Sequence, residues 1–262
     1  MQPSALHPFD PAVAETFVLA LDGRLNITEL PGLDRAWSEQ ILAVARTGYE
    51  RASKGQERGF NEITAAFGQA ISALHPTFQH DGLSLTSWEA QIDRGAGMLM
   101  RPPARFLIEA GLDPAIARNL AIRLDFSHGM MGGAYVPPKL VPQLATLLDH
   151  RFDRLVKRMV AAEIDPLPHM SLLIEAVAYA QQNNLGLYET LGVVIPDAIG
   201  SIPPGARVVM FDRKRMDPEM RKRIELAAKP VKEPSKFAKL LNRSKPSSDE
   251  LPSQNGHVHL DE

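Results

Sequence analysis

The sequence of 262 residues contains no cysteine. Disulfide bridges, a thiolate nucleophile, a zinc ribbon and a cysteine-ligated iron–sulfur cluster are therefore excluded. Long apolar runs are also missing, because no uninterrupted stretch approaches the roughly 18 residues that a membrane-spanning helix needs. The first basic residue is Arg24, so the positively charged start of a secretory signal is lacking as well. We expect a cytoplasmic protein.

Apolar residues make up 44% of the chain and charged residues 23%, which is typical of a soluble globular protein and excludes whole-chain disorder or collagen. The net charge of −2 hides an uneven distribution. Segment 207–245 holds thirteen basic and five acidic residues, a net charge of +8, whereas segment 1–206 has a net charge of −6. An acidic body is therefore followed by a basic extension.

Helical periodicity dominates the body. Apolar residues recur at steps of three and four, and they predict helices over 34–53, 60–74, 139–161 and 168–183. Asp-Pro pairs begin at Asp10, Asp113, Asp165 and Asp217. Each pair combines a capping carboxylate with a proline preset for the first helical position, so we expect these aspartates to be N-caps rather than catalytic groups.

Short runs rich in β-branched and aromatic residues predict strands at 98–100, 122–126, 134–136, 193–195 and 208–211. The fold class is then α+β, a predominantly α-helical single domain with a few short strands. We expect an N-terminal arm over 1–9, the mainly helical domain over 10–212, and a basic, largely disordered C-terminal extension over 213–262. Two short helices are expected in or beside that extension, at 218–228 and 235–243.

The stretch 121–138 concentrates side chains that could carry chemistry. A predicted strand delivers Arg123 and Asp125, and a glycine-containing loop follows. The loop residues of interest are Ser127, His128, Gly129, Gly132 and Gly133. Glycines let backbone amides converge on a ligand. The spacing matches neither a phosphate-binding loop, nor a dinucleotide fingerprint, nor a nucleophile elbow, so a plain β-turn at Gly132–Gly133 is the competing interpretation.

A second cluster contains Arg94, Arg101 and Arg105 on a stretch broken by glycine and proline. Three guanidinium groups could hold a carboxylate or phosphate in fork geometry. The alternative is that Asp93 and Glu89 pair with these arginines at the surface. His75, His80 and Asp81 lack the spacing of a metal motif, and we expect no metal and no cofactor.

The basic extension has two main interpretations, a solvated tether that keeps the protein soluble and a docking segment for a protein partner. Its candidate contact residues are Lys236, Phe237, Lys239, Leu240 and Leu241. The extension offers a single aromatic residue and an apolar face only about two turns long, so we do not expect contact with nucleic acid or membrane. Self-association through the faces of 34–53 or 139–161 stays open.

Two functions of different class compete. We favour a non-catalytic intracellular interaction or regulatory module with a helical body and a basic docking tail. The alternative is a binding protein or enzyme for an anionic small molecule, with a site around the Arg123–Gly133 loop and the arginines from Arg94 to Arg105. In that case Ser127 or His128 would react or transfer protons, and Asp125 would orient them.

Overall fold

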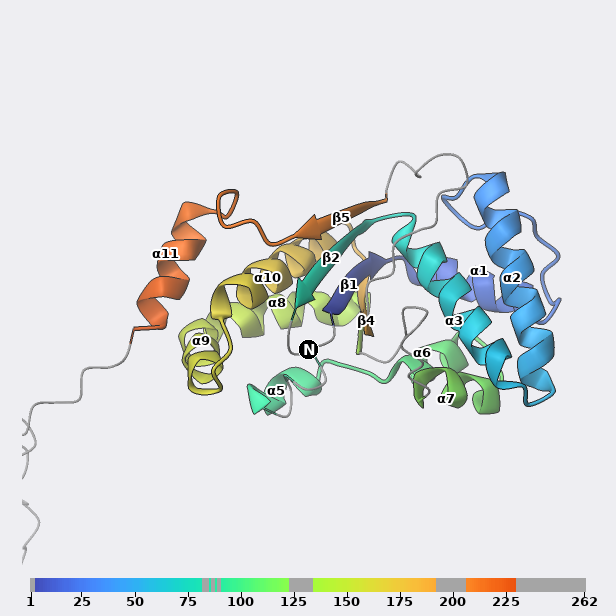
Figure 1. The fold of residues 1–262 in the computed structure, drawn as a ribbon, viewed down its shortest axis with the longest axis horizontal. Coiled ribbons are helices and arrows are strands. Elements are labelled where there is room, and N and C mark those ends of the chain that lie inside the picture. The colour runs from blue at the N-terminus through green and yellow to red at the C-terminus, as the bar shows by residue number, and fades with distance from the viewer. Residues whose placement is uncertain are drawn as a thin grey trace, which may run out of the picture. The chain divides into compact units, whose positions relative to one another are not determined.

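The computed structural model describes residues 3–81, 85, 88, 91–122, 134–191 and 206–229. A five-stranded sheet with the strand order β3-β4-β1-β2-β5 lies at its centre (Figure 1). The strands are β1 (Pro3–Phe9), β2 (Pro76–Asp81), β3 (Tyr135–Val136), β4 (Gly186–Leu191) and β5 (Arg207–Met210). The central strand β1 pairs antiparallel with both β2 and β4, β3 pairs antiparallel with β4, and β5 runs parallel to β2.

The sheet separates two hydrophobic clusters, because successive side chains of a strand point to opposite faces. Phe9 and Tyr188 belong to one cluster, whereas Leu6 and Leu187, from the same two strands, belong to the other. The first cluster includes residues of α1 (Pro11–Leu21), α2 (Arg35–Ser53), α3 (Glu57–Ser72), α6 (Pro103–Glu109) and α7 (Pro114–Ile122). The second includes residues of α5 (Arg94–Gly97), α8 (Val141–His150), α9 (Phe152–Ala161), α10 (Pro166–Gln182) and α11 (Pro218–Ala227). This architecture confirms the predicted fold class, a mainly helical α+β domain.

All four Asp-Pro pairs cap helices, as the sequence predicts. In each case an aspartate oxygen accepts a hydrogen bond from a backbone amide two residues later, at 2.8–3.1 Å. The capped helices are α1, α7, α10 and α11. These carboxylates satisfy amides that have no partner inside their helices, which is a structural role.

The helices α2 and α3 form a hairpin whose two members approach each other at glycines. The predicted helix 34–53 matches α2, and α3 begins at Glu57, three residues before the predicted start. A Cβ atom added to Gly48 would lie 2.9 Å from the carbonyl oxygen of Gly59, and one added to Gly59 would lie 2.5 Å from the carbonyl oxygen of Gly48. Neither position has room for a side chain, so the two backbones pack directly against each other.

His7 is a buried polar residue on β1. Its Nε2 lies 3.1 Å from the Thr190 hydroxyl on β4, and its Nδ1 lies 3.1 Å from the Thr77 hydroxyl on β2. The side chain is 1% exposed, and burial lowers its pKa to about 3. Both ring nitrogens are therefore engaged across the three central strands while the ring stays neutral.

The helix predicted over 139–161 is broken in the structure. A short 3-10 turn at Pro138–Leu140 leads into α8, and α8 and α9 are separated at Arg151, whose φ and ψ are −105° and 9°. Buried Leu148, Phe152 and Leu155 keep helical spacing across the break, which is why the periodicity alone indicates one continuous helix.

The strand predictions succeed only in part. Those at 134–136 and 208–211 correspond to β3 and β5, whereas 98–100 is wrong because Met98 and Leu99 form a turn after α5. The prediction at 122–126 is wrong at Ile122, the last residue of α7, and its remainder lies outside the described residues, as does 193–195.

Both ends of the predicted body are placed differently by the structure. Residues 3–9, expected in an N-terminal arm, form the central strand of the sheet. At the other end, the helix expected at 218–228 is α11, and its buried Ile224 and Ala227 belong to the second hydrophobic cluster. The compact unit therefore extends to Ala228 instead of ending at 212. The helix expected at 235–243 lies outside the described residues.

Candidate functional site

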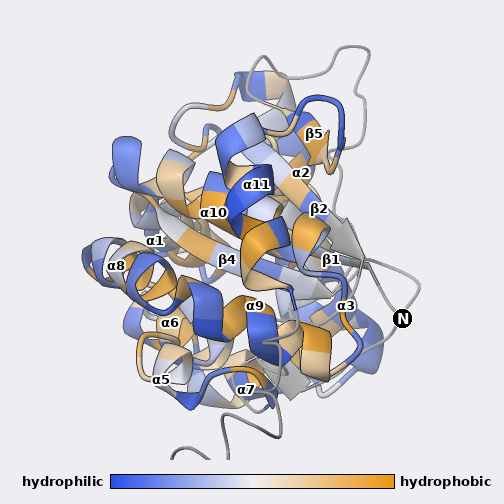
Figure 2. Ribbon diagram, turned by 90° about the vertical axis from the view of Figure 1, so that its left-hand side faces the viewer, coloured by the Kyte–Doolittle hydropathy of each residue, from blue (hydrophilic) through white to orange (hydrophobic). Residues whose placement is uncertain are grey.

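Helix α9 has cationic side chains on its exposed side and packs against the protein core with its other side. Its buried side chains, Phe152, Leu155, Val156 and Met159, follow three- and four-residue steps and belong to the second hydrophobic cluster. Arg154 and Lys157 occupy the alternate positions and are exposed. This amphipathic pattern makes the outward face of α9 polar. Figure 2 looks onto this side of the protein, where the ribbons of α9 and α11 alternate between hydrophilic and hydrophobic stretches.

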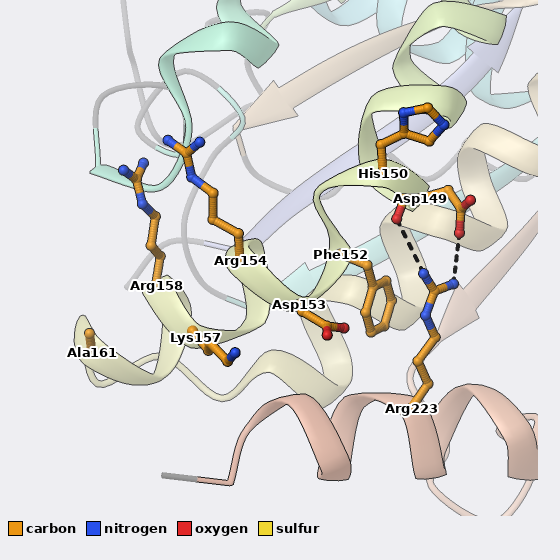
Figure 3. A pocket seen from close by; sticks show the side chains of 9 residues that line it. All are labelled: Asp149, His150, Phe152, Asp153, Arg154, Lys157, Arg158, Ala161 and Arg223. Atoms are coloured by element: carbon orange, nitrogen blue, oxygen red, sulfur yellow. Dashed lines mark hydrogen bonds and ion pairs between the residues drawn. The ribbon is translucent and has the colours of Figure 1, made fainter. Parts of the chain in front are cut away.

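Helix α11 packs beside α9 and α10 and is fastened by Arg223. The Arg223 guanidinium donates one hydrogen bond to the Asp149 carboxylate at 2.8 Å and a second to the Asp149 carbonyl oxygen at 3.2 Å. It also lies 4.0 Å from the centre of the Phe152 ring, which is cation–π geometry. Arg223 thus joins α11 to the junction of α8 and α9 (Figure 3).

A hollow of about 620 Å³ lies along these helices, and we call it the α9–α11 groove. It is lined by Asp149, His150, Phe152, Asp153, Arg154, Lys157, Arg158, Ala161 and Arg223 (Figure 3). Four lining side chains are permanent cations and two are carboxylates, so the groove is locally positive although the whole chain has a net charge of −2. A local excess of one sign attracts ligands of the opposite sign regardless of the total charge.

Some cations of this region have structural partners. Arg151 donates to the Asp93 carboxylate at 2.6 Å, and Asp93 is 1% exposed and also accepts the Gly95 amide at 2.8 Å. Arg158 donates to the carbonyl oxygen of Ile92. These two arginines therefore hold segment 92–93 against α9. A buried carboxylate needs such partners, because an unpaired charge in the interior is strongly unfavourable.

The remaining cations do not hold a buried group. On α11, Arg221 and Arg213 pair with the exposed Glu225, and the hydrogen bond from Arg221 lowers the pKa of the Glu225 carboxyl. Arg154 and Lys157 have no carboxylate partner among the residues that the structure describes. Both line the groove and are exposed, so both are available to an incoming anion.

A smaller hollow of about 170 Å³, which we call the apolar hollow, adjoins the groove between α8, α10 and α11. Its apolar lining residues are Ala145, Leu148, Phe152, Ile174, Val177, Ala178 and Met220. The polar lining residues are Asp149, Gln181 and Arg223, and all three are exposed. Asp149, Phe152 and Arg223 line both cavities, so the apolar hollow and the positive groove are direct neighbours.

Arg101 and Arg105, two of the predicted ligand-binding arginines, have partners within the described part of the chain. Arg101 donates from Nη1 to the carbonyl oxygens of Met98 and Met100, at 3.0 and 2.8 Å, and Arg105 pairs with Glu109 at 2.9 Å. The surface pairing expected with Asp93 is wrong, because Asp93 is buried and bound to Arg151. Glu89 lies outside the residues whose side chains are described.

Arg94, the third arginine of the predicted cluster, is the exposed first residue of α5. The loop residues Arg123, Asp125, Ser127, His128, Gly129, Gly132 and Gly133 lie outside the described ranges, as do the docking residues Lys236, Phe237, Lys239, Leu240 and Leu241. The main chain of Arg101 does pair with Tyr135, two residues after that loop. The described ranges contain no group of three potential metal ligands and no helix with the length and apolar character to cross a membrane.

Sequence reasoning missed the α9–α11 groove, although one signal of it is visible. The cations of α9 are apparent as the polar face of a predicted helix. The sequence does not show that α11 packs against α9 and adds Arg223 to these cations. Comparisons with family models, curated proteins and solved structures find no match for the chain.

Proposed function

We propose that the protein is a non-catalytic binding module that takes up an acidic segment of a partner protein in the α9–α11 groove. The observation that carries the proposal is the pair Arg154 and Lys157, exposed and without a carboxylate partner among the described side chains, in a groove with a cationic excess. Carboxylates of a partner would replace water at these two cations and at the exposed edge of Arg223.

A protein segment fits this groove better than a nucleic acid does. The Phe152 ring is covered by Arg223, so it offers no free face on which a base could stack. Asp149 and Asp153 also line the groove and would repel a regularly charged phosphate backbone. A peptide can space its few carboxylates to meet Arg154 and Lys157 and avoid these two positions.

The first test is charge reversal in the groove. The double substitution Arg154→Glu with Lys157→Glu is expected to weaken binding of a fluorescein-labelled glutamate-rich peptide by about tenfold or more at low salt, because each close ion pair contributes up to about 1 kcal/mol. Fluorescence anisotropy with the full chain measures this. Arg118→Glu with Lys54→Glu, at exposed positions on α7 and at the end of α2, is the control with the same change in total charge and should leave the affinity unchanged.

Two outcomes would contradict the proposal. Equal weakening by Arg118→Glu with Lys54→Glu would mean that the peptide responds to the overall charge and has no defined site. Tighter binding of a single-stranded DNA oligonucleotide than of the peptide, lost in the groove double variant, would assign the groove to nucleic acid instead.

A second test removes a negative charge from the groove. Asp149→Asn is expected to strengthen binding of the same peptide about threefold to fivefold. The substitution removes a negative charge that repels the carboxylates of the peptide, and it releases Arg223 from its ionic partner. The free energy of unfolding should fall by less than about 1 kcal/mol, since the Asp149–Arg223 pair is exposed to solvent. Anisotropy and denaturant unfolding measure the two effects, and Glu50→Gln on the exposed face of α2 is the control. Weaker binding by Asp149→Asn would show that Arg223 has to be held by Asp149 to act.

A further inference from the structure

The apolar hollow has the size and lining of a site for one side chain. Its volume is about 170 Å³, and Leu148, Phe152 and Val177 are its buried lining residues. An apolar cavity of about 150 Å³ accommodates a benzene ring, so this hollow has room for a leucine or phenylalanine side chain. A water molecule in the hollow would form few hydrogen bonds, because most of the lining residues are apolar.

The position of the hollow relates it to the charged groove. Arg223 and Asp149 line both cavities, and the Phe152 ring lies beneath the Arg223 guanidinium. A chain that places a side chain in the apolar hollow therefore has its neighbouring residues beside the Asp149–Arg223 pair, where the groove begins. On a helix, residues three or four apart share a face, so one short segment can supply both groups.

We infer that the acidic segment recognised by this protein carries a large apolar anchor, leucine or phenylalanine, which fills the apolar hollow while the flanking carboxylates meet the groove cations. The inference rests on the proposed function and adds a sequence requirement to it. Charge complementarity decides the occupant: Arg223 at the exposed rim and Arg154 and Lys157 beyond it favour a segment that is apolar at one position and acidic around it. A purely acidic segment would leave the hollow unfilled.

The test compares two short fluorescein-labelled peptides of glutamate and alanine that differ at one central position, leucine in one and alanine in the other. The full chain is expected to bind the leucine peptide about tenfold more tightly, because the leucine side chain leaves water only in that complex. Ala178→Leu places extra carbon atoms in the hollow and should abolish this difference between the two peptides. Ala145→Leu, on the facing helix α8, is a second filling variant in case the first one disturbs α10.

The outcomes separate the inference from the proposed function. Equal affinity of the unsubstituted chain for both peptides overturns the anchor and leaves the acidic-segment proposal intact. Failure to bind either peptide overturns the proposed function. Tighter binding of dodecanoate than of the leucine peptide, lost in Ala178→Leu, would assign the hollow to a fatty-acid chain and overturn the anchor as well.

Discussion

Lowering the pH from 6.5 to about 4 is expected to reduce the free energy of unfolding by about 3 kcal/mol through one side chain, His7. Burial lowers the pKa of His7 to about 3 in the folded protein, whereas its ordinary value is 6.5. Above pH 6.5 the ring is neutral in both states and contributes no pH dependence. Below that value the unfolded chain takes up a proton that the folded chain does not, so stability falls steadily until the pH approaches 3.

The measurement is the free energy of unfolding in denaturant at several pH values for the unsubstituted chain and for His7→Gln. The variant should be less stable at neutral pH by about 1–3 kcal/mol, since glutamine cannot reproduce both threonine hydrogen bonds. On acidification below pH 6.5 the free energy of unfolding of the variant should fall less steeply than that of the unsubstituted chain. The difference between the two slopes should be about 1.4 kcal/mol per pH unit. His150→Gln is the control, because His150 is exposed in the folded protein. Parallel profiles for the unsubstituted chain and His7→Gln would exclude His7 as the source.

Gly59→Ala is expected to destabilise the protein by about 3 kcal/mol, although alanine favours helices over glycine by up to about 1 kcal/mol. The new Cβ would lie 2.5 Å from the carbonyl oxygen of Gly48 and would also collide with the backbone nitrogen of Ala52. Both are main-chain atoms of α2, which cannot rotate away. The two helices must therefore separate, and the core residues between them lose contact.

Thermal unfolding measures this effect, with a decrease in the midpoint of roughly 10 °C for a domain of this size. Thr47→Ala is the matched control, since Thr47 precedes Gly48 on α2 but faces solvent. The control should be neutral or slightly stabilising because alanine has the better helix propensity. An increase in stability with Gly59→Ala would show that propensity decides at this position and that α2 and α3 are not in close contact there.

The features that could be predicted from the sequence are those determined by local interactions. The Asp-Pro caps depend on amides two residues away, and the apolar face of α2 depends on residues within one or two helical turns. The break at Arg151 is not visible in this way, because the apolar spacing continues through it.

The central strand escaped prediction for a different reason. Ala5 and Leu6 point to opposite faces of the sheet and both are buried, so β1 has no alternation between apolar and polar residues. His7 and two prolines make the segment look like a loop, yet His7 is satisfied by threonines from the strands on either side. Those threonines are far away in the sequence, so no local sequence pattern predicts that they contact His7.

The candidate site shows the same limit. The cations of α9 and the apolar positions of α11, such as Ile224, are each visible as one face of a helix. The contact that joins them, Arg223 with Asp149 and Phe152, connects residues separated by more than 70 positions. The groove is a product of that long-range packing.

The place of β1 in the sheet has a consequence for synthesis on the ribosome. One edge of β1 pairs with β2, but its other edge pairs with β4, and 183 positions separate His7 from Thr190. At about 5–20 residues per second, translation of that interval takes roughly 10 to 40 s. During this time the nascent chain carries a strand with an unpaired edge, the kind of surface that pairs with other chains. The domain therefore completes its sheet only after most of its sequence has left the ribosome, and a chaperone that shields the strand until then should raise the yield of folded protein.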